Sequence, residues 1–277
     1  MTNIRIDRTK STEYEELDIE INDADEDTIS YVLRKTFRET DMIENLQTAE
    51  NCNKDYERQH GTRYNIIRRM KKESFLLDEI IAAKKEGKLD KFISPFDEID
   101  IPLDTGGYVT VVCAYSNPNT ARFVFKDCWD EGVMNEETTT NGGYYKSKGR
   151  EHVLVDILPK ISQEWRDIFK PRKMVEEIDG ERIEYADPMW LLSATDVFGP
   201  SPEGYWRDID DSFQFQLPIF QRMRDRVKEC GDKGTYPYWL RSVDATSSNI
   251  FRLVVTGGGC SFNGARWLNG FAPGFDI

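Results

Sequence analysis

Residues 238–277 constrain the fold more than any other stretch of this chain. Residues 238–240 (YWL) and 250–255 (IFRLVV) are rich in aromatic and β-branched side chains, which is typical of strands. A polar loop over 244–248 separates them, and three glycines at 257–259 predict a turn. Chain termini usually fray, whereas residues 271–277 (FAPGFDI) are apolar. We therefore expect the end of the chain to be a buried strand of a sheet.

Composition excludes several classes of protein. The chain has 277 residues and a formal net charge of −13, which disfavours binding to nucleic-acid phosphates. Its apolar runs are shorter than the roughly 18–20 residues that a membrane-spanning helix needs. Residues 1–17 show no secretory signal, so synthesis in the cytoplasm without a signal peptide is expected. Five scattered cysteines, no Cys-x-x-Cys and two histidines predict free thiols and no zinc site.

The N-terminal part is predicted to be an acidic arm followed by a helical module, over residues 1–92. Residues 1–27 are strongly acidic, which fits either a flexible arm or a peripheral strand. Apolar residues at helical spacing predict helices over 28–37 and 62–88, the second ending at Gly87. The apolar stripe of such helices either packs within the chain or mediates self-association or attachment to a larger assembly. Both alternatives remain open from the sequence.

The pattern changes near Pro95, which places the start of a second domain at residue 93 and its end at 277. Alternating segments over 99–103 and 108–114 predict a hairpin, and 123–125 a third strand. Further along we expect a surface loop over 134–150 ending in a helix, two short helices over 150–169 divided at Pro159, a hairpin over 174–185, a strand over 189–193, a short helix over 194–199 and a helix over 213–225. This irregular alternation favours an α+β fold.

Several motifs occur in an order that resembles a known domain family. They are WLRS at 239–242, Asn249, Phe251, GFAPGF at 270–275, FKDCW at 125–129, TNGGYYKS at 140–147 and MWLLSAT at 189–195. The resemblance, over roughly 95–277, is to a family of unknown function that is abundant in gut bacteria and their phages. It implies a C-type-lectin-like fold, as in phage tropism determinants and the variable proteins of diversity-generating retroelements. The shared apolar positions should be buried in one core: Trp190, Trp239, Leu240, Phe251, Val254, Phe271 and Phe275.

The same resemblance indicates where a ligand would bind. In the variable proteins, framework residues alternate with freely changing ones near the C-terminus. Positions here that depart from the family's wording are candidate ligand-binding residues: Asp244, Thr246, Arg252, Leu253, Phe262, Asn263, Arg266 and Trp267. Arg252 should face away from Phe251 and the core, and Trp and Arg dominate binding hot spots. The expected ligand is a protein or glycan on a cell surface; packing of these side chains against the N-terminal helices is the alternative.

Reactive chemistry is not expected. His60 and His152 lack a catalytic pattern. An enzyme is the alternative, since formylglycine-generating enzymes share the implied fold and use paired cysteines, for which Cys230 and Cys260 would be the candidates. A structural virion or assembly subunit is a third hypothesis. No cofactor is expected, although the acidic loop at 208–211 could hold structural calcium or simply be solvated. Arg241 is interpreted as a buried residue that makes either a charge-assisted hydrogen bond or an ion pair.

Overall fold

The computed structural model describes strands at 3–10, 14–22, 47–49 and 62–69, and then residues 73–178, 180–201, 204–206 and 215–277. Side chains are described from residue 77 onward within these ranges. The chain divides into two compact units, Met1–Ala82 and Ala83–Ile277. No helix in these described ranges is long and apolar enough to cross a membrane.

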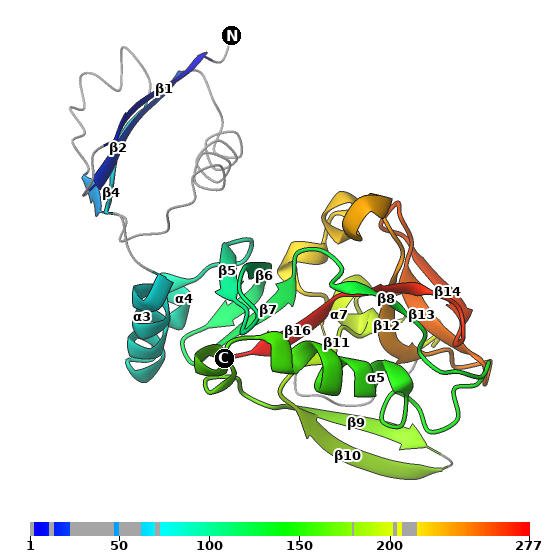
Figure 1. The fold of residues 1–277 in the computed structure, drawn as a ribbon. Helices are drawn as coiled ribbons and strands as arrows, with labels where there is room; N and C mark the ends of the chain where they lie inside the picture. The colour runs from blue at the N-terminus through cyan, green and yellow to red at the C-terminus, as the bar shows by residue number, and fades with distance from the viewer. Residues whose placement is uncertain are drawn as a thin grey trace. The chain divides into compact units, whose positions relative to one another are not determined.

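The described part of the first unit contains a four-stranded antiparallel sheet with the order β1-β2-β4-β3, of which Figure 1 labels β1, β2 and β4. Its strands are β1 (Asn3–Lys10), β2 (Tyr14–Asn22), β3 (Gln47–Ala49) and β4 (Thr62–Arg69). The single helix predicted over 62–88 is therefore wrong: a strand occupies its first eight residues, and helix α3 (Glu73–Lys85) follows. Tyr64 and Ile66 alternate with polar Arg63 and Asn65, so the period of two applies there. The helix predicted over 28–37 lies outside the described residues.

One sheet of the second unit has the order β11-β16-β7-β6-β5 (Figure 1). The short helix α4 (Leu89–Phe92) precedes it. The strands are β5 (Glu98–Pro102), β6 (Tyr108–Asn117), β7 (Thr120–Phe125), β11 (Trp190–Leu191) and β16 (Pro273–Asp276). The predicted hairpin is confirmed by the pairing of β5 with β6, and the predicted third strand by β7. The predicted C-terminal strand is also confirmed: β16 pairs with β7 and β11 and is buried.

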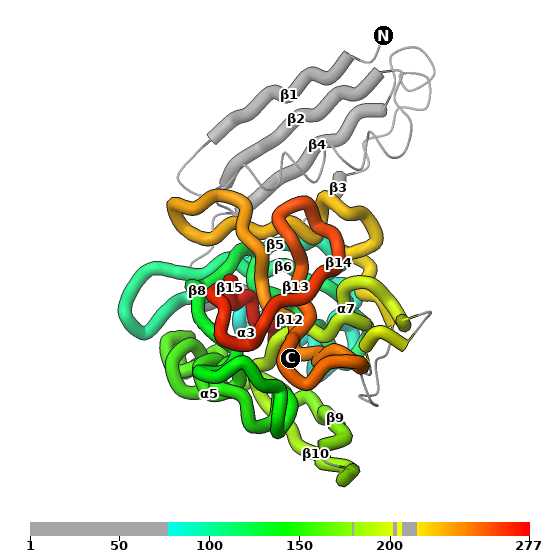
Figure 2. Tube along the Cα trace, turned by 90° about the vertical axis from the view of Figure 1, so that its right-hand side faces the viewer, coloured from blue at the N-terminus to red at the C-terminus, as the bar shows by residue number. Residues whose placement is uncertain are grey.

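The other five-stranded sheet has the order β14-β13-β12-β15-β8. It contains β8 (Asp130–Gly132), β12 (Tyr238–Val243), β13 (Ile250–Val254), β14 (Cys260–Gly264) and β15 (Asn269–Phe271). Strands β12, β13 and β14 run antiparallel to one another, whereas β15 joins β12 in parallel at Tyr238 and Gly270. Figure 2 shows these strands side by side. The strands expected at 238–240 and 250–255 are thus confirmed.

Short helices and a hairpin lie in the sequence between β8 and β12. These elements are α5 (Lys148–His152), a π turn (Val153–Ile157), a 3-10 turn (Leu158–Lys160), α6 (Gln163–Arg166), the hairpin β9 (Arg172–Ile178) and β10 (Glu181–Asp187), and α7 (Ala194–Phe198). The combination of helices with several sheets confirms the α+β class. In place of the helix predicted over 213–225, the described part has two 3-10 turns, Pro218–Phe220 and Met223–Arg226.

The loop over 134–150 is less superficial than predicted. Met134 and Tyr144 are fully buried. Gly143 has a φ of 62°, and a Cβ there would lie 2.0 Å from the Glu176 carboxylate, which accepts a bond from the backbone of Tyr145. Ser147 caps helix α5 by accepting from the backbone N–H of Arg150. The TNGGYYKS motif at 140–147 therefore packs against strand β9 and is hydrogen-bonded to it.

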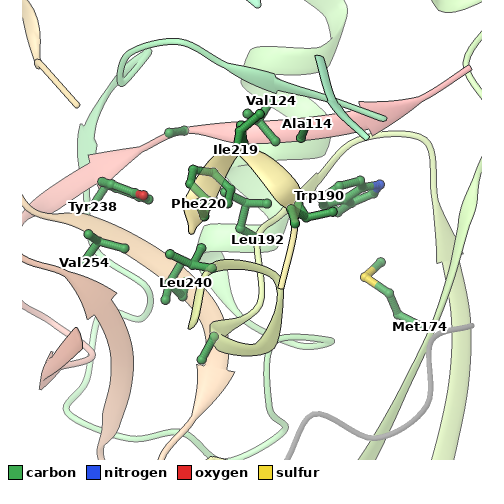
Figure 3. Close-up of a cluster of buried hydrophobic side chains, with 14 residues drawn as sticks. Ala114, Val124, Met174, Trp190, Leu192, Ile219, Phe220, Tyr238, Leu240 and Val254 are labelled. Atoms are coloured by element: carbon green, nitrogen blue, oxygen red, sulfur yellow. The ribbon is translucent and has the colours of Figure 1, made fainter. Parts of the chain in front are cut away.

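The seven apolar side chains expected to be buried are all completely inaccessible to solvent. Trp190, Leu240 and Val254 share one cluster with residues of α7 and of the Pro218–Phe220 turn (Figure 3). Complete burial of a large apolar side chain stabilises a fold by roughly 1.5–3 kcal/mol. The motifs that carry the family resemblance thus supply the core.

A buried charge network lies beside this core, centred on Asp196. Arg172 donates two hydrogen bonds of 3.0 Å to the Asp196 carboxylate, and Arg122 Nη1 lies 3.7 Å from it. Burial alone would raise the pKa of Asp196, but Arg172, Arg122 and Arg241 together lower it. Arg241 is 6% exposed, so its predicted burial is confirmed. The guanidinium groups of Arg122 and Arg172 also lie against the Trp190 ring.

Candidate recognition surface

Strands β13 and β14 and the segment after β14 position the residues predicted to bind a ligand. Arg252 of β13 lies opposite Phe262 of β14, and Phe251 lies opposite Asn263. Gly258 makes the turn between the strands with a φ of 81°. A Cβ on Gly258 would lie 2.0 Å from the Met223 carbonyl oxygen, so no other residue fits there without movement of the backbone.

Three of the predicted ligand-binding residues are buried: Asp244, Arg252 and Leu253 are 8%, 7% and 3% exposed. The expectation that Arg252 faces solvent is therefore wrong. Its guanidinium forms an ion pair with Asp244 and donates to the Tyr205 carbonyl oxygen at 2.8 Å. The rings of Tyr205, Trp206 and Phe262 each lie within 5.8 Å of it. Although Arg252 does point away from Phe251, a second layer of side chains covers that face.

Asp244 also organises the loop that follows β12. Its Oδ1 accepts hydrogen bonds from the backbone N–H of Thr246 at 2.8 Å and from the Thr246 hydroxyl at 2.7 Å. Thr246 itself is exposed. A single carboxylate thus bonds both this loop and Arg252, which gives Asp244 a positioning role in the structure.

Four predicted residues are exposed or half-buried on β14 and the turn after it. Phe262 and Trp267 are 54% and 63% exposed, and Arg266 is also exposed. A Cβ on Gly264 would lie 3.0 Å from the Trp267 ring. Gly264 and Phe262 share one face of β14 because they are two residues apart, so Trp267 covers the same face that carries Phe262. Asn263, which lies on the opposite face, is half-buried.

An open pocket of about 620 Å³ borders this exposed group, lined by Tyr236, Arg266, Trp267 and Leu268. Leu268 is 55% exposed. We call Tyr236, Phe262, Arg266, Trp267 and Leu268 the aromatic patch. Exposed apolar groups of this kind on a soluble protein commonly mark an interaction site.

Arg266 is chemically distinct within the aromatic patch. Among the residues whose side chains are described, it has neither an ion-pair nor a hydrogen-bond partner. Its neighbours are engaged: Tyr236 donates to Glu131 at 2.8 Å, and Lys233 forms an ion pair with the same carboxylate. A free guanidinium next to an exposed indole can bind a carboxylate, sulfate or phosphate group while the ring stacks on an apolar face.

Tyr236 was not predicted to be a site residue, and Leu268, although it departs from the family's wording, was not among the predicted ligand-binding residues. Tyr236 lies about thirty residues before Trp267 and reaches the pocket because β12 and β15 run in parallel. The N–H of Gly270 donates to the Pro237 carbonyl oxygen at 2.8 Å, which holds the two segments together. No local pattern around Tyr236 could have revealed this pairing. Leu268, in contrast, comes directly after the predicted residues Arg266 and Trp267, and this position could have identified it as a site residue.

The other candidates of the sequence analysis lie elsewhere. Cys260 is exposed near Arg252, whereas Cys230 is buried next to Cys128, so the structure does not bring together the two cysteines named for the enzyme alternative. His152 lies 2.9 Å from Asp156 and 3.0 Å from Asp130. His60 and the acidic loop at 208–211 lie outside the described residues. Among the side chains that are described, no three acidic, histidine or cysteine residues are grouped as metal ligands would be.

Comparison with known proteins identifies the domain without indicating an activity. No curated protein and no solved structure matches this chain. The sequence profile of a family described as a domain of unknown function, DUF6273, matches residues 110–275. This match covers more than half of the chain and includes the core motifs, the sheet β14-β13-β12-β15-β8, most of the other five-stranded sheet except β5, and the aromatic patch from Tyr236 onward. The chain therefore belongs to the DUF6273 family.

Proposed function

We propose that this protein is a non-catalytic ligand-recognition protein whose binding surface is the aromatic patch. The observation that carries the proposal is the exposure of Phe262, Trp267 and Leu268, each of which is more than half accessible to solvent. All three lie in one stretch of seven residues at the end of a well-packed sheet. An exposed Trp and Arg at the centre of a pocket have the composition of binding hot spots. Phe251, Val254 and Ala265 beneath them are fully buried, which provides a rigid base.

The ligand that we propose is a protein or glycan on a cell surface that presents an acidic group. The indole of Trp267 offers a flat apolar surface suited to a sugar ring or an apolar side chain. Arg266 offers a charge without a partner among the described side chains, so an anionic group could bind there without displacing an existing ion pair. Because the protein as a whole has a formal net charge of −13, a local cation such as Arg266 would determine where an acidic ligand binds.

We further propose that residues 93–277 have a C-type-lectin-like fold and act as a phage tropism component or a retroelement-diversified variable protein. Support comes from the motif order and from the burial of the motif residues Trp190, Trp239, Phe251 and Phe275. Recognition in such proteins would use exposed positions on an unchanging core. Phe262, Arg266 and Trp267 are exposed and lie outside the shared motifs.

The decisive experiment replaces Arg266 and Trp267 together by Ala. We expect the melting temperature to stay nearly constant, because exposed positions usually change stability by about 0.5 kcal/mol or less. Binding to a panel of acidic glycans, neutral glycans and whole bacterial cells should fall by about 30-fold or more, as expected for a hot-spot residue. Arg266→Ala alone should reduce the sensitivity of binding to salt.

A matched control is the double variant Tyr108→Ala and Arg224→Ala. Both side chains are strongly exposed, at 61% and 71%, and neither lines the pocket. This variant should keep wild-type binding. A large fall in melting temperature for the Arg266 and Trp267 variant would show that the patch is structural, and unchanged binding would show that the ligand binds elsewhere.

A further inference from the structure

Two cysteines that are far apart in the sequence meet in the second unit. The side chains of Cys128 and Cys230 are close enough for each to affect the pKa of the other. Cys128 lies just after β7, and Cys230 begins the 3-10 turn Gly231–Lys233. Neither cysteine belongs to the aromatic patch, and the proposed recognition function does not use them.

Backbone hydrogen bonds hold the segments of the two cysteines side by side. The N–H of Cys128 donates to the Glu229 carbonyl oxygen at 2.8 Å, and the N–H of Glu229 donates to the Asp127 carboxylate at 3.0 Å. Because Glu229 directly precedes Cys230, these bonds place the two cysteines on neighbouring segments. Disulfides join Cα atoms about 4.4–6.8 Å apart, a spacing that residues on such neighbouring segments can reach.

The surroundings confine both cysteines. A Cβ on Gly270 of β15 would lie 2.3 Å from the Cys128 sulfur, so that sulfur lies directly on the backbone of β15. On the Cys230 side, its N–H donates to the Gly234 carbonyl oxygen at 2.9 Å, and Glu229 and Thr235 form an isolated antiparallel bridge. The turn that carries Cys230 is therefore closed at its base.

We propose that Cys128 and Cys230 are a redox-sensitive pair that forms an intramolecular disulfide by exchange with a low-molecular-weight disulfide such as oxidised glutathione. The thiolate of one cysteine attacks a sulfur of oxidised glutathione, and one glutathione leaves as its thiolate. The thiolate of the other cysteine then attacks the protein sulfur of this mixed disulfide, and the second glutathione leaves. Two protein thiols are oxidised, one glutathione disulfide is reduced, and the two thiol protons pass to the departing glutathiones.

The local electrostatics predict that this exchange is slow. Burial raises the pKa of Cys128 to about 12, even though the buried ammonium of Lys228 opposes that rise. Burial also raises the pKa of Cys230. Both groups are therefore mainly thiols at neutral pH, whereas the attacking species is the thiolate. The pair should respond to sustained oxidising conditions, and the assay needs incubation over hours.

The product would connect the end of β7 to the turn that leads into Tyr236 and β12. Its closed loop of about a hundred residues removes many conformations from the unfolded chain, which raises stability. Under the chain-entropy model, the oxidised protein should melt several degrees above the reduced protein. This effect does not depend on whether the aromatic patch binds a ligand.

The test incubates the full-length protein in glutathione buffers of increasing oxidised fraction, then alkylates free thiols and maps the cysteines by mass spectrometry. We expect one cross-linked peptide pair containing Cys128 and Cys230, a rise in melting temperature and reversal of both by dithiothreitol. Cys260→Ser should behave like the wild type, whereas Cys128→Ser and Cys230→Ser should show no rise.

Three results would overturn the proposal: stable glutathione adducts on Cys128 or Cys230 without a cross-link, cross-links that join other cysteines instead, or both thiols remaining free in fully oxidised glutathione. Peptide mapping of the wild-type protein decides among these outcomes even if a serine variant fails to fold.

Discussion

The Trp239 side chain stabilises the fold both through its buried ring and through a hydrogen bond from its indole N–H. The ring is fully buried beside Phe251, and Nε1 donates to the Gly132 carbonyl oxygen at 2.9 Å, which connects β12 to β8. Trp239→Ala should lower the free energy of unfolding by about 3–5 kcal/mol. Trp239→Phe keeps most of the apolar area and should cost about 1–3 kcal/mol, because the carbonyl oxygen loses its donor.

Denaturant unfolding of the two Trp239 variants measures these differences. Equal losses would mean that the hydrogen bond to Gly132, and not the ring, accounts for most of the contribution of Trp239. An exposed control such as Tyr108→Ala should change the free energy of unfolding by about 0.5 kcal/mol or less. A similar loss in the control and in Trp239→Ala would contradict the central position of Trp239 in the core.

Single residues also show how far sequence reasoning reached. Burial of Trp239 and Phe275 was predictable because large apolar side chains in strand patterns leave water. Arg252 was predicted to be exposed because strand periodicity separates two faces of a sheet. Periodicity does not reveal that Tyr205 and Trp206 cover the second face. The exposure of Trp267 was expected because it departs from the family's wording and because Trp is a residue type that dominates binding hot spots.

At the scale of elements, His152 joins helix α5 to strand β8. Its Nε2 lies 3.0 Å from the Asp130 carboxylate, and its Nδ1 lies 2.9 Å from that of Asp156. The hydrogen bond with Asp130 is the larger cause of a raised His152 pKa; partial burial opposes it, and Asp156 adds to the rise. Because the pKa is raised in the folded state, the protonated histidine stabilises the fold fully below its unfolded pKa of about 6.5. This stabilisation is lost as the pH rises through the folded pKa.

His152→Gln should therefore lower the melting temperature more at pH 5.5 than at pH 8.5. The pair is partly exposed, so the difference should be on the order of 0.5–1 kcal/mol. Lys148→Gln is the matched control, since its exposed ion pair with Glu151 contains no histidine and that carboxylate raises the already high pKa of Lys148. A His152→Gln effect that is equal at the two pH values would show that the histidine acts through packing on Phe271 alone.

Elements with strong local signals were the predictable ones. The hairpins β5–β6 and β9–β10 follow alternating segments around turn residues, and α7 begins with a capping box of Ser193 and Asp196. Residues 62–69 were misassigned because Tyr64, Ile67 and Met70 also fit a helical period. When a short segment fits both the strand period and the helical period, pairing with a neighbouring strand determines its secondary structure. Residues 62–69 form β4, which pairs with β2 and β3.

At the scale of the whole molecule, the division at residue 83 predicts an independently folding fragment. Helix α4 lies beyond that division, and it contacts β6 and β7. Leu89 is fully buried, and its N–H donates to the Pro118 carbonyl oxygen at 3.2 Å. A fragment of residues 83–277 should unfold cooperatively. A fragment of 93–277 should be less stable by at least the roughly 2–5 kcal/mol that loss of a buried Leu costs.

Circular dichroism and denaturant titration of the two fragments check this prediction. Leu89→Ala in the longer fragment serves as the intermediate control. Loss of cooperative unfolding in residues 83–277 would mean that the preceding residues complete the core. Equal stability of the two fragments would mean that α4 is dispensable, and the boundary expected at residue 93 would then be adequate.

The arrangement of the sheets explains why the aromatic patch was only partly predictable. Trp267 and Arg266 are adjacent in the sequence, and their residue types suggested binding. Tyr236 reaches the same pocket through the parallel contact between β12 and β15, which depends on how the whole sheet is ordered. Sequence periodicity specifies which face of a strand is apolar, but strand order is set by packing between distant segments.

Strand β16 has a consequence for how this protein is made. It lies between β11 and β7, both of which are synthesised well before it. At about 5–20 residues per second, a ribosome needs roughly 4–16 s to translate from β11 to β16. During that interval the nascent chain exposes the unpaired edge of β7, which invites aggregation. The sheet closes only after residue 276 has left the ribosome, so chaperones that shield nascent strands should govern the yield of soluble protein.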